Sequence, residues 1–141
     1  MPGADLWGAA LLAATALHAG FQLTVTALVY PALVRVPPEQ FAQAHVRHSR
    51  AITPVVGLVY GGALVVCVGA VAVDPSSVAA WLAAVVTGAA FSVTAVRAAP
   101  LHGRLGRTGS DRELLASLVR ADRVRTLAAV LALVAALVHA R

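Results

Sequence analysis

The sequence predicts an all-α integral membrane protein, a single domain built as a four-helix up-down bundle. Its 141 residues are 60% hydrophobic and only 12% charged, about half the charged fraction of an ordinary soluble domain. The charged residues gather at the ends of long apolar runs. A chain this short cannot bury four helices that are apolar on every side, so a membrane must cover them.

The four predicted spans cover residues 8–33, 48–73, 77–98 and 119–139. Each of the first three contains an uncharged stretch longer than the roughly 20 residues that cross a hydrocarbon core about 30 Å thick. In the fourth, only residues 126–138 are uncharged, and a helix of that length rises about 20 Å. The fourth helix can therefore span a membrane only if it takes in the charged residues before it.

Proline and serine residues mark the helix boundaries. Pro37 and Pro38 suit the start of the second helix. Ser76 or Ser77 suits the N-cap of the third helix. Residues 102–113 are expected to form the longest loop, which ends in a capping box formed by a serine and a glutamate three residues later.

The distribution of arginine predicts the orientation. The first and third connections carry most of the eleven cationic residues, all of them Arg, whereas the second connection carries only Asp74 and the N-terminus only Asp5. The positive-inside rule then predicts a basic cytoplasmic face, both termini outside, and a multi-pass protein of a bacterial-type inner membrane. The N-terminus lacks the basic segment of a cleaved signal peptide, so the first span should be retained. We therefore expect the net charge of +5 to interact with membrane lipid, and we expect no nucleic acid as a partner.

A polar stripe runs along the first helix. His18, Gln22, Thr26 and Tyr30 recur every four residues and share one face. Polar groups in hydrocarbon face the bundle or a wet cavity. His18 and Gln22 are therefore expected either to line a functional cavity or to form interhelical hydrogen bonds. For Thr26, a hydrogen bond to its own helix backbone is the simpler interpretation.

The second helix carries His45 and His48 on one face. These imidazoles could be solvated polar groups, substrate or acid–base contacts, or metal ligands. No acidic ligand accompanies them and the chain has one cysteine, Cys67, so we predict no metal site. Tyr60 is expected to point inward, and the glycines of residues 57–62 are expected to allow close helix packing.

Asp122 is the only carboxylate within reach of the inner boundary of the hydrocarbon. An unpaired carboxylate there would cost a few kcal/mol. Its candidate partners are a group of basic residues, namely Arg125, Arg50, Arg97 and His48. The resulting network could be a structural salt bridge or could position a polar group of a substrate.

Three motifs resemble the anthrone-oxygenase-like family of small four-helix membrane proteins. These are "YPAL" at residues 30–33, "PLHGRL" at 100–105 and "LVRADRVRTLAAVLALVAAL" at 118–137. The family usually carries Asn where His102 stands. The resemblance implies oxygenation or cyclisation of a hydrophobic polyketide- or terpenoid-like substrate without an evident metal cofactor.

The sequence therefore predicts a membrane enzyme that acts on a lipophilic small molecule by acid–base chemistry in an intramembrane cavity, with no cofactor. We expect His18, His48 and Asp122 to be catalytic. The residues expected to bind the substrate are Gln22, Tyr30, His45, Arg50, Tyr60, Arg97, His102, Arg123 and Arg125. A homo-oligomer is compatible with the sequence.

Two alternatives stay open, a small transporter or channel, and a haem-binding or structural subunit. The first lacks a carboxylate near the midplane of the membrane. The second fits poorly because His18 and the pair of His45 and His48 lie at different depths.

Overall fold

The computed structural model describes residues 2–141, with side chains from residue 6 onward, and within that range the chain forms helices and no strands. The elements follow one another as α1 (Pro2–Thr24), the π-helical turn η1 (Val25–Val29), α2 (Tyr30–Val34), α3 (Pro38–Val73), α4 (Val78–Val93), the π-helical turn η2 (Thr94–Ala98), α5 (Ala99–Thr108) and α6 (Arg112–His139). Because η1 and η2 continue their neighbours without a break, the eight elements form four long rods.

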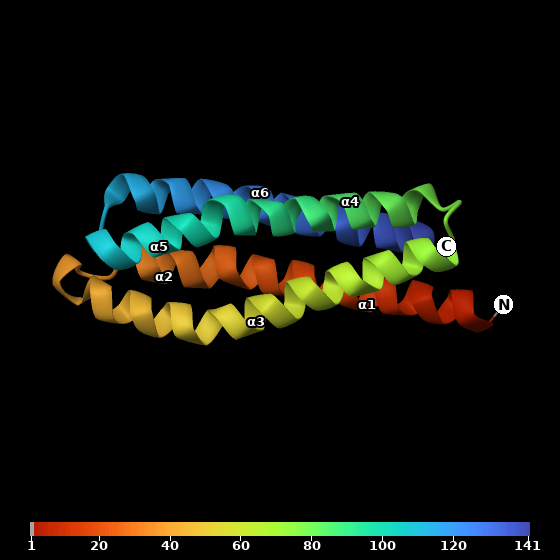
Figure 1. Ribbon diagram of the computed structural model, residues 1–141, viewed down its shortest axis with the longest axis horizontal. Coiled ribbons are helices and arrows are strands. Elements are labelled where there is room, and N and C mark those ends of the chain that lie inside the picture. The colour runs from red at the N-terminus through yellow and green to blue at the C-terminus, as the bar shows by residue number, and fades with distance from the viewer. Residues whose placement is uncertain (1) are drawn as a thin grey trace.

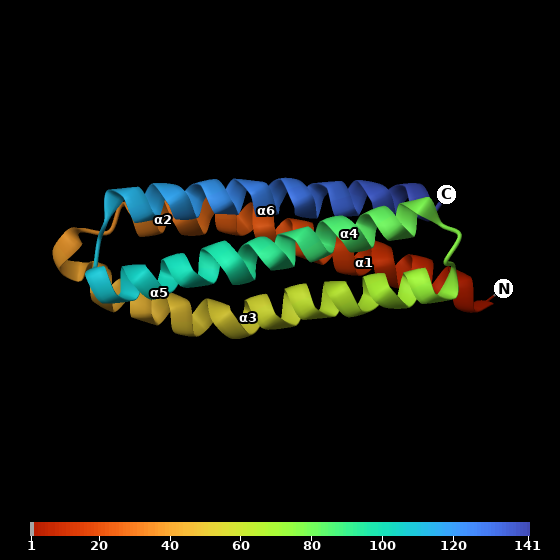
Figure 2. The same cartoon turned by 45° about the horizontal axis from the view of Figure 1, so that its top comes forward.

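The four rods run up and down as one elongated bundle (Figure 1). The α1 rod packs against α3 and α6, and α4 packs against α3 and most extensively against α6. The view in Figure 2 shows the same order, with the α2–α3 and α5–α6 connections at one end and both ends of the chain at the other. We call the end with these two connections the arginine-rich end, since Arg141 alone among the arginines lies at the opposite end. The prediction of an all-α four-helix bundle is confirmed.

Three of the rods are long and apolar enough to cross a membrane, namely Leu6–Val34, Pro38–Val73 and Val78–Thr108. The α6 helix is not among them, in keeping with the charged residues of its first half. Large apolar side chains such as Leu58, Val78 and Leu127 are mostly exposed on the outer surface of the bundle. This surface suits hydrocarbon rather than water.

Two of the three predicted helix starts are confirmed. Pro38 opens α3, and the Ser77 hydroxyl caps α4 by accepting a hydrogen bond from the Ala80 N–H at 3.2 Å. The predicted loop at residues 102–113 is wrong, because α5 continues to Thr108. Gly109 follows as the C-cap, and its φ of +78° is a conformation that glycine adopts without strain.

The predicted capping box at the start of α6 is also wrong. Asp111, rather than the serine before it, is the N-cap and accepts hydrogen bonds from the N–H groups of Glu113 and Leu114. A carboxylate at this position also interacts favourably with the helix dipole.

Close packing through the glycines of residues 57–62 is a further expectation that the structure contradicts. A Cβ placed on Gly57, Gly61 or Gly62 would meet no described atom within 4 Å. The close approach lies further along α3, at Gly69, where an added Cβ would overlap the ring of Trp7 on α1. The glycine that allows α3 to approach α1 closely is therefore Gly69, which lies outside the predicted stretch.

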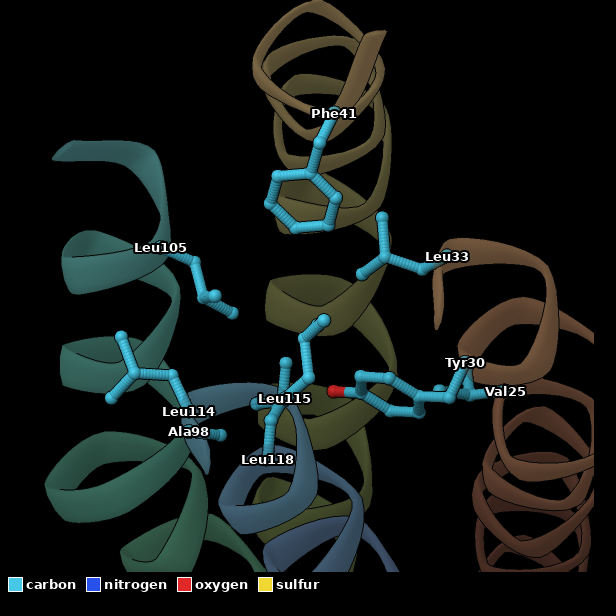
Figure 3. Close-up of a cluster of buried hydrophobic side chains, with 9 residues drawn as sticks. All are labelled: Val25, Tyr30, Leu33, Phe41, Ala98, Leu105, Leu114, Leu115 and Leu118. Atoms are coloured by element: carbon cyan, nitrogen blue, oxygen red, sulfur yellow. The ribbon is translucent and has the colours of Figure 1, made fainter. Parts of the chain in front are cut away.

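The core changes character along the bundle. Bulky side chains of α2, α3, α5 and α6 fill the arginine-rich end, among them Leu33, Phe41, Leu105 and Leu118 (Figure 3). Small residues, mainly alanines, fill the opposite end around Leu11 and Cys67. Between these two layers lie most of the buried polar side chains, beside a small apolar cluster of Val59, Tyr60 and Ala90. Figure 3 shows Tyr30 reaching from α2 toward α6.

Three of the four rods contain a proline near the polar side chains. Pro31 follows η1, Pro100 follows η2, and Pro54 lies inside α3. A proline removes one backbone hydrogen bond and its ring crowds the carbonyl four residues earlier, which a π-helical turn or a bend relieves. These irregularities surround the site described next.

Candidate functional site

The centre of the polar layer is Asp122 on α6, whose side chain is 1% exposed. Its Oδ1 accepts hydrogen bonds from Gln22 Nε2 at 2.6 Å and Arg125 Nη2 at 2.9 Å. Its Oδ2 accepts one from the Thr26 hydroxyl at 2.6 Å. This buried carboxylate is thus bound by three donors, and Arg125 is the partner among the four predicted candidates.

The network extends through two tyrosines. Tyr60 on α3 donates its hydroxyl hydrogen to Gln22 Oε1 at 2.6 Å. Tyr30 accepts a hydrogen bond from Arg125 Nη2 at 2.9 Å. Both tyrosines are almost fully buried. One set of hydrogen bonds therefore joins α1, α2, α3 and α6, and those made by Asp122 and Arg125 are charge-assisted.

Three histidines continue the network toward the arginine-rich end. The Tyr30 hydroxyl lies 3.4 Å from His102 Nε2, and His102 Nδ1 lies 3.1 Å from His45 Nε2. The His48 ring lies beside His102, with 5.9 Å between the ring centroids. Both nitrogens of His102 are therefore engaged.

A cavity of about 280 Å³ lies against this network. Its apolar lining comes from Phe21, Val25, Ile52, Val56, Ala98 and Ala99. Its polar lining comes from Gln22, Tyr30, His48, Ser49, Thr53, Thr94, His102 and Arg125. By surface area the walls are mostly apolar, and such walls with converging polar groups are typical of a small-molecule site.

The cavity is partly open, and its exposed lining residues lie on α3 and α5. The exposed residues of its lining are Thr53 on α3 and Ala99 on α5, and these two mark the mouth. Thr53 is three residues from Arg50 and Ala99 is two residues from Arg97, the charged residues that border the uncharged stretch of each rod. The mouth therefore lies beside the arginines that end the uncharged stretch of each rod.

Two buried polar atoms of the lining have no hydrogen-bond partner among the described residues, Ser49 Oγ and Arg125 Nε. A buried donor without a partner costs about 1–3 kcal/mol. Since both residues line the cavity, a polar group held there could satisfy them. The charges of Asp122 and Arg125 cancel each other, so the cavity suits a neutral oxygen-bearing group better than an anion.

The predicted site residues fall into three groups. Those that line the cavity are Gln22, Tyr30, His48, His102 and Arg125. Those buried behind its lining or beside it are His18, His45, Tyr60 and Asp122. Those outside it are Arg50, which is exposed, and Arg97 and Arg123, which line separate grooves on the outer surface.

Four residues of the site were not predicted from the sequence. Ser49 and Thr94 line the cavity, and Thr26 and Thr126 lie beside Asp122. Thr26 bonds Asp122 instead of its own backbone, and its hydroxyl lies 2.6 Å from that of Thr126. Ser49 follows His45 by four residues, a spacing that places it on the same face of the helix. That spacing is the one signal that could have identified it.

The comparisons with known proteins add no assignment: no protein family, curated protein or solved structure matches the chain.

Proposed function

We propose that this protein is a membrane enzyme that draws a lipophilic ketone, of polyketide- or terpenoid-like character, from the bilayer and transfers a proton on it. The observation that supports this most directly is the lateral cavity, which brings Arg125, Tyr30 and His48 around one apolar space. Its mouth between α3 and α5 faces lipid, so an apolar ligand can enter without crossing water.

The proposed reaction begins with removal of a proton from a carbon whose electron pair can delocalise onto the carbonyl oxygen, either the carbon next to the carbonyl group or one conjugated with it through a ring. His48 is the base, because both nitrogens of His102 are engaged by Tyr30 and His45. The electron pair of the broken C–H bond forms a C=C bond, and the carbonyl oxygen becomes an oxyanion. Positioned acid–base groups contribute about 10²–10⁴-fold to such steps.

Arg125 and Tyr30 are the groups that stabilise the oxyanion, and in the tautomer of His102 that carries its hydrogen on Nε2 the Tyr30 hydroxyl keeps its own hydrogen free for this role. Donors held in place in a site of low polarity stabilise developing charge without having to reorient. Asp122 acts as a positioning residue, since it holds Arg125 at 2.9 Å and does not line the cavity. The proton returns from His48 to another carbon in an isomerisation, whereas an oxygenation requires O₂ as the oxidant of the enolate.

The test uses anthrone as a probe, a tricyclic ketone whose C10 hydrogens are acidic. Protein in lipid nanodiscs is incubated under nitrogen with anthrone deuterated at C10, and mass spectrometry follows the exchange of deuterium for protium. Empty nanodiscs supply the background rate. We expect the protein to accelerate exchange, and we expect His48→Gln and Tyr30→Phe to slow it by about 10²-fold.

A matched pair of alanine variants tests the place of reaction. Ala98 is buried and lines the cavity, whereas Ala95 in the same π-helical turn is exposed on the outside. Ala98→Leu should abolish the acceleration and Ala95→Leu should leave it intact. Exchange at the background rate in every sample, or equal rates for the two variants, would refute the proposal. Retention of anthrone without exchange would point to a carrier instead.

A further inference from the structure

A second hollow lies outside the bundle, on the face where η2 and α5 run beside α6. It is an open groove of about 700 Å³, separate from the lateral cavity and sharing none of its lining residues. Its walls come from two helical stripes with the spacing of three or four residues that places side chains on one face. One stripe runs from Val93 at the end of α4 through η2 to Arg104 on α5, and the other follows α6 from Glu113 to Val124.

Three arginines line this groove, namely Arg97, Arg104 and Arg120. Glu113 is the only carboxylate among the lining residues, which leaves an excess of two positive charges. None of the three arginines forms a salt bridge, because the one ion pair within residues 6–141 joins Asp122 to Arg125. Arg120 is held by a hydrogen bond from its Nη2 to Ser117 Oγ at 2.8 Å, so one guanidinium is fixed above the groove.

The groove changes from charged to apolar along its length. Arg104 lies toward the arginine-rich end, whereas Val93, Val96 and Val124 lie toward the middle of the bundle. Val96 and Val124 are 68% and 53% exposed, which leaves their side chains free to contact another molecule. The groove therefore offers a cationic end at the membrane interface and an apolar wall that continues into the hydrocarbon.

We propose that this groove binds an anionic phospholipid. The phosphodiester lies among Arg97, Arg104 and Arg120, which present planar donor groups that match phosphate oxygens. One acyl chain lies along Val93, Val96 and Val124. Basic pockets between membrane helices bind anionic headgroups in this manner, and the apolar wall favours a lipid over a free phosphate. The proposal does not depend on the proposed enzyme activity.

The test compares two triple variants that remove the same charge at the same end of the bundle. The groove variant carries Arg97→Gln, Arg104→Gln and Arg120→Gln. The control carries Arg47→Gln, Arg50→Gln and Arg107→Gln, three arginines that do not line this groove or the lateral cavity. Native mass spectrometry measures binding of phosphatidylglycerol, phosphatidylcholine and glycerol phosphate to the full chain released from detergent.

We expect the groove variant to bind phosphatidylglycerol at least tenfold more weakly than the unchanged protein, and the control to bind it within twofold. Equal losses in the two variants would show general attraction to a basic surface and would overturn the site. Equal binding of phosphatidylcholine would overturn the charge requirement, and equal binding of glycerol phosphate would overturn the lipid. If the groove variant does not fold, the unchanged protein is photo-crosslinked with diazirine-labelled phosphatidylglycerol. We expect the crosslinked residues to lie within 93–104 and 113–124, and crosslinks confined to other residues would contradict the proposal.

Discussion

His18 and Gln22 lie one turn apart on α1 and both are fully buried, yet their polar atoms have different surroundings. Gln22 joins Asp122 to Tyr60 through two hydrogen bonds of 2.6 Å. His18 packs edge-on against Tyr60, with 4.3 Å between the ring centroids, and neither of its nitrogens has a hydrogen-bond partner among the described residues. One residue therefore supports the network and the other only fills space beside it.

We expect His18→Leu to raise the free energy of unfolding by about 1 kcal/mol. Removal of unsatisfied buried polar atoms gains about 1–3 kcal/mol, and loss of the ring contact with Tyr60 costs about 0.5–1.5 kcal/mol. Unfolding by denaturing detergent in mixed micelles measures the change.

Gln22→Leu is the matched comparison and should lower the free energy of unfolding by about 2 kcal/mol, because it removes one of the three donors to Asp122 and leaves the Tyr60 hydroxyl without its acceptor. A destabilising His18→Leu substitution would contradict the interpretation of His18 and would mean that its nitrogens are satisfied by a bound molecule.

At the scale of single helices, the contact between Gly69 and Trp7 sets how closely α3 approaches α1. We expect Gly69→Ala to lower the free energy of unfolding by about 1–3 kcal/mol, since the added methyl group would overlap the indole ring. Gly61→Ala is the control in the same helix, because a methyl group there meets nothing within 4 Å among the described atoms. It should be neutral or should stabilise by up to about 1 kcal/mol through helix propensity.

The same mixed-micelle unfolding assay distinguishes the two glycine variants. Equal effects of Gly69→Ala and Gly61→Ala would show that the α1–α3 distance does not depend on this contact.

Hydrophobic length and helix-start signals were enough to predict the four rods and the starts of α3 and α4. They failed at α5, where two internal glycines made residues 102–108 look like a loop. Two glycines together cost about 2 kcal/mol in a helix, and burial of Leu105 among Phe41 and Leu118, which contributes about 1.5–3 kcal/mol, offsets this cost. That packing involves residues far away in the sequence, so the residues of α5 alone cannot predict it.

The site shows the same limit at the scale of the whole molecule. The sequence alone marked Asp122 as a carboxylate that must be paired, because a membrane makes an unpaired charge costly. The sequence did not decide among four candidate partners of Asp122, because no single helix contains the information that fixes the order of helices around the bundle. Once α1 and α6 are neighbours, Gln22, Thr26 and Arg125 surround the carboxylate, and Arg50 and Arg97 face outward.

The gathering of arginines at one end of the bundle predicts its orientation in a membrane. We expect the α2–α3 and α5–α6 connections to face the cytoplasm, with the α3–α4 turn and both chain ends on the other side. Ser110→Cys and Ser76→Cys report on the two sides, each in a Cys67→Ala background. Cys67 is buried in the small-residue core, and its removal leaves the reporter as the only thiol.

In intact cells, a membrane-impermeant maleimide should label the thiol of Ser76→Cys, whereas the thiol of Ser110→Cys should react only after lysis. Labelling of Ser110→Cys in intact cells would reverse the orientation, and equal labelling of both variants would indicate a mixed one.

The position of the lateral mouth affects how a ligand would be recruited. A long amphiphile in a bilayer already stands with its polar end at the interface and its apolar part along the membrane normal. In the proposed placement in a membrane, the mouth beside Thr53 and Ala99 lies at that same depth. The bilayer would therefore orient the molecule before the protein touches it, which removes part of the rotational entropy that binding from water would cost. Two molecules of equal hydrophobicity would then differ in their access to the cavity according to the way they align in lipid.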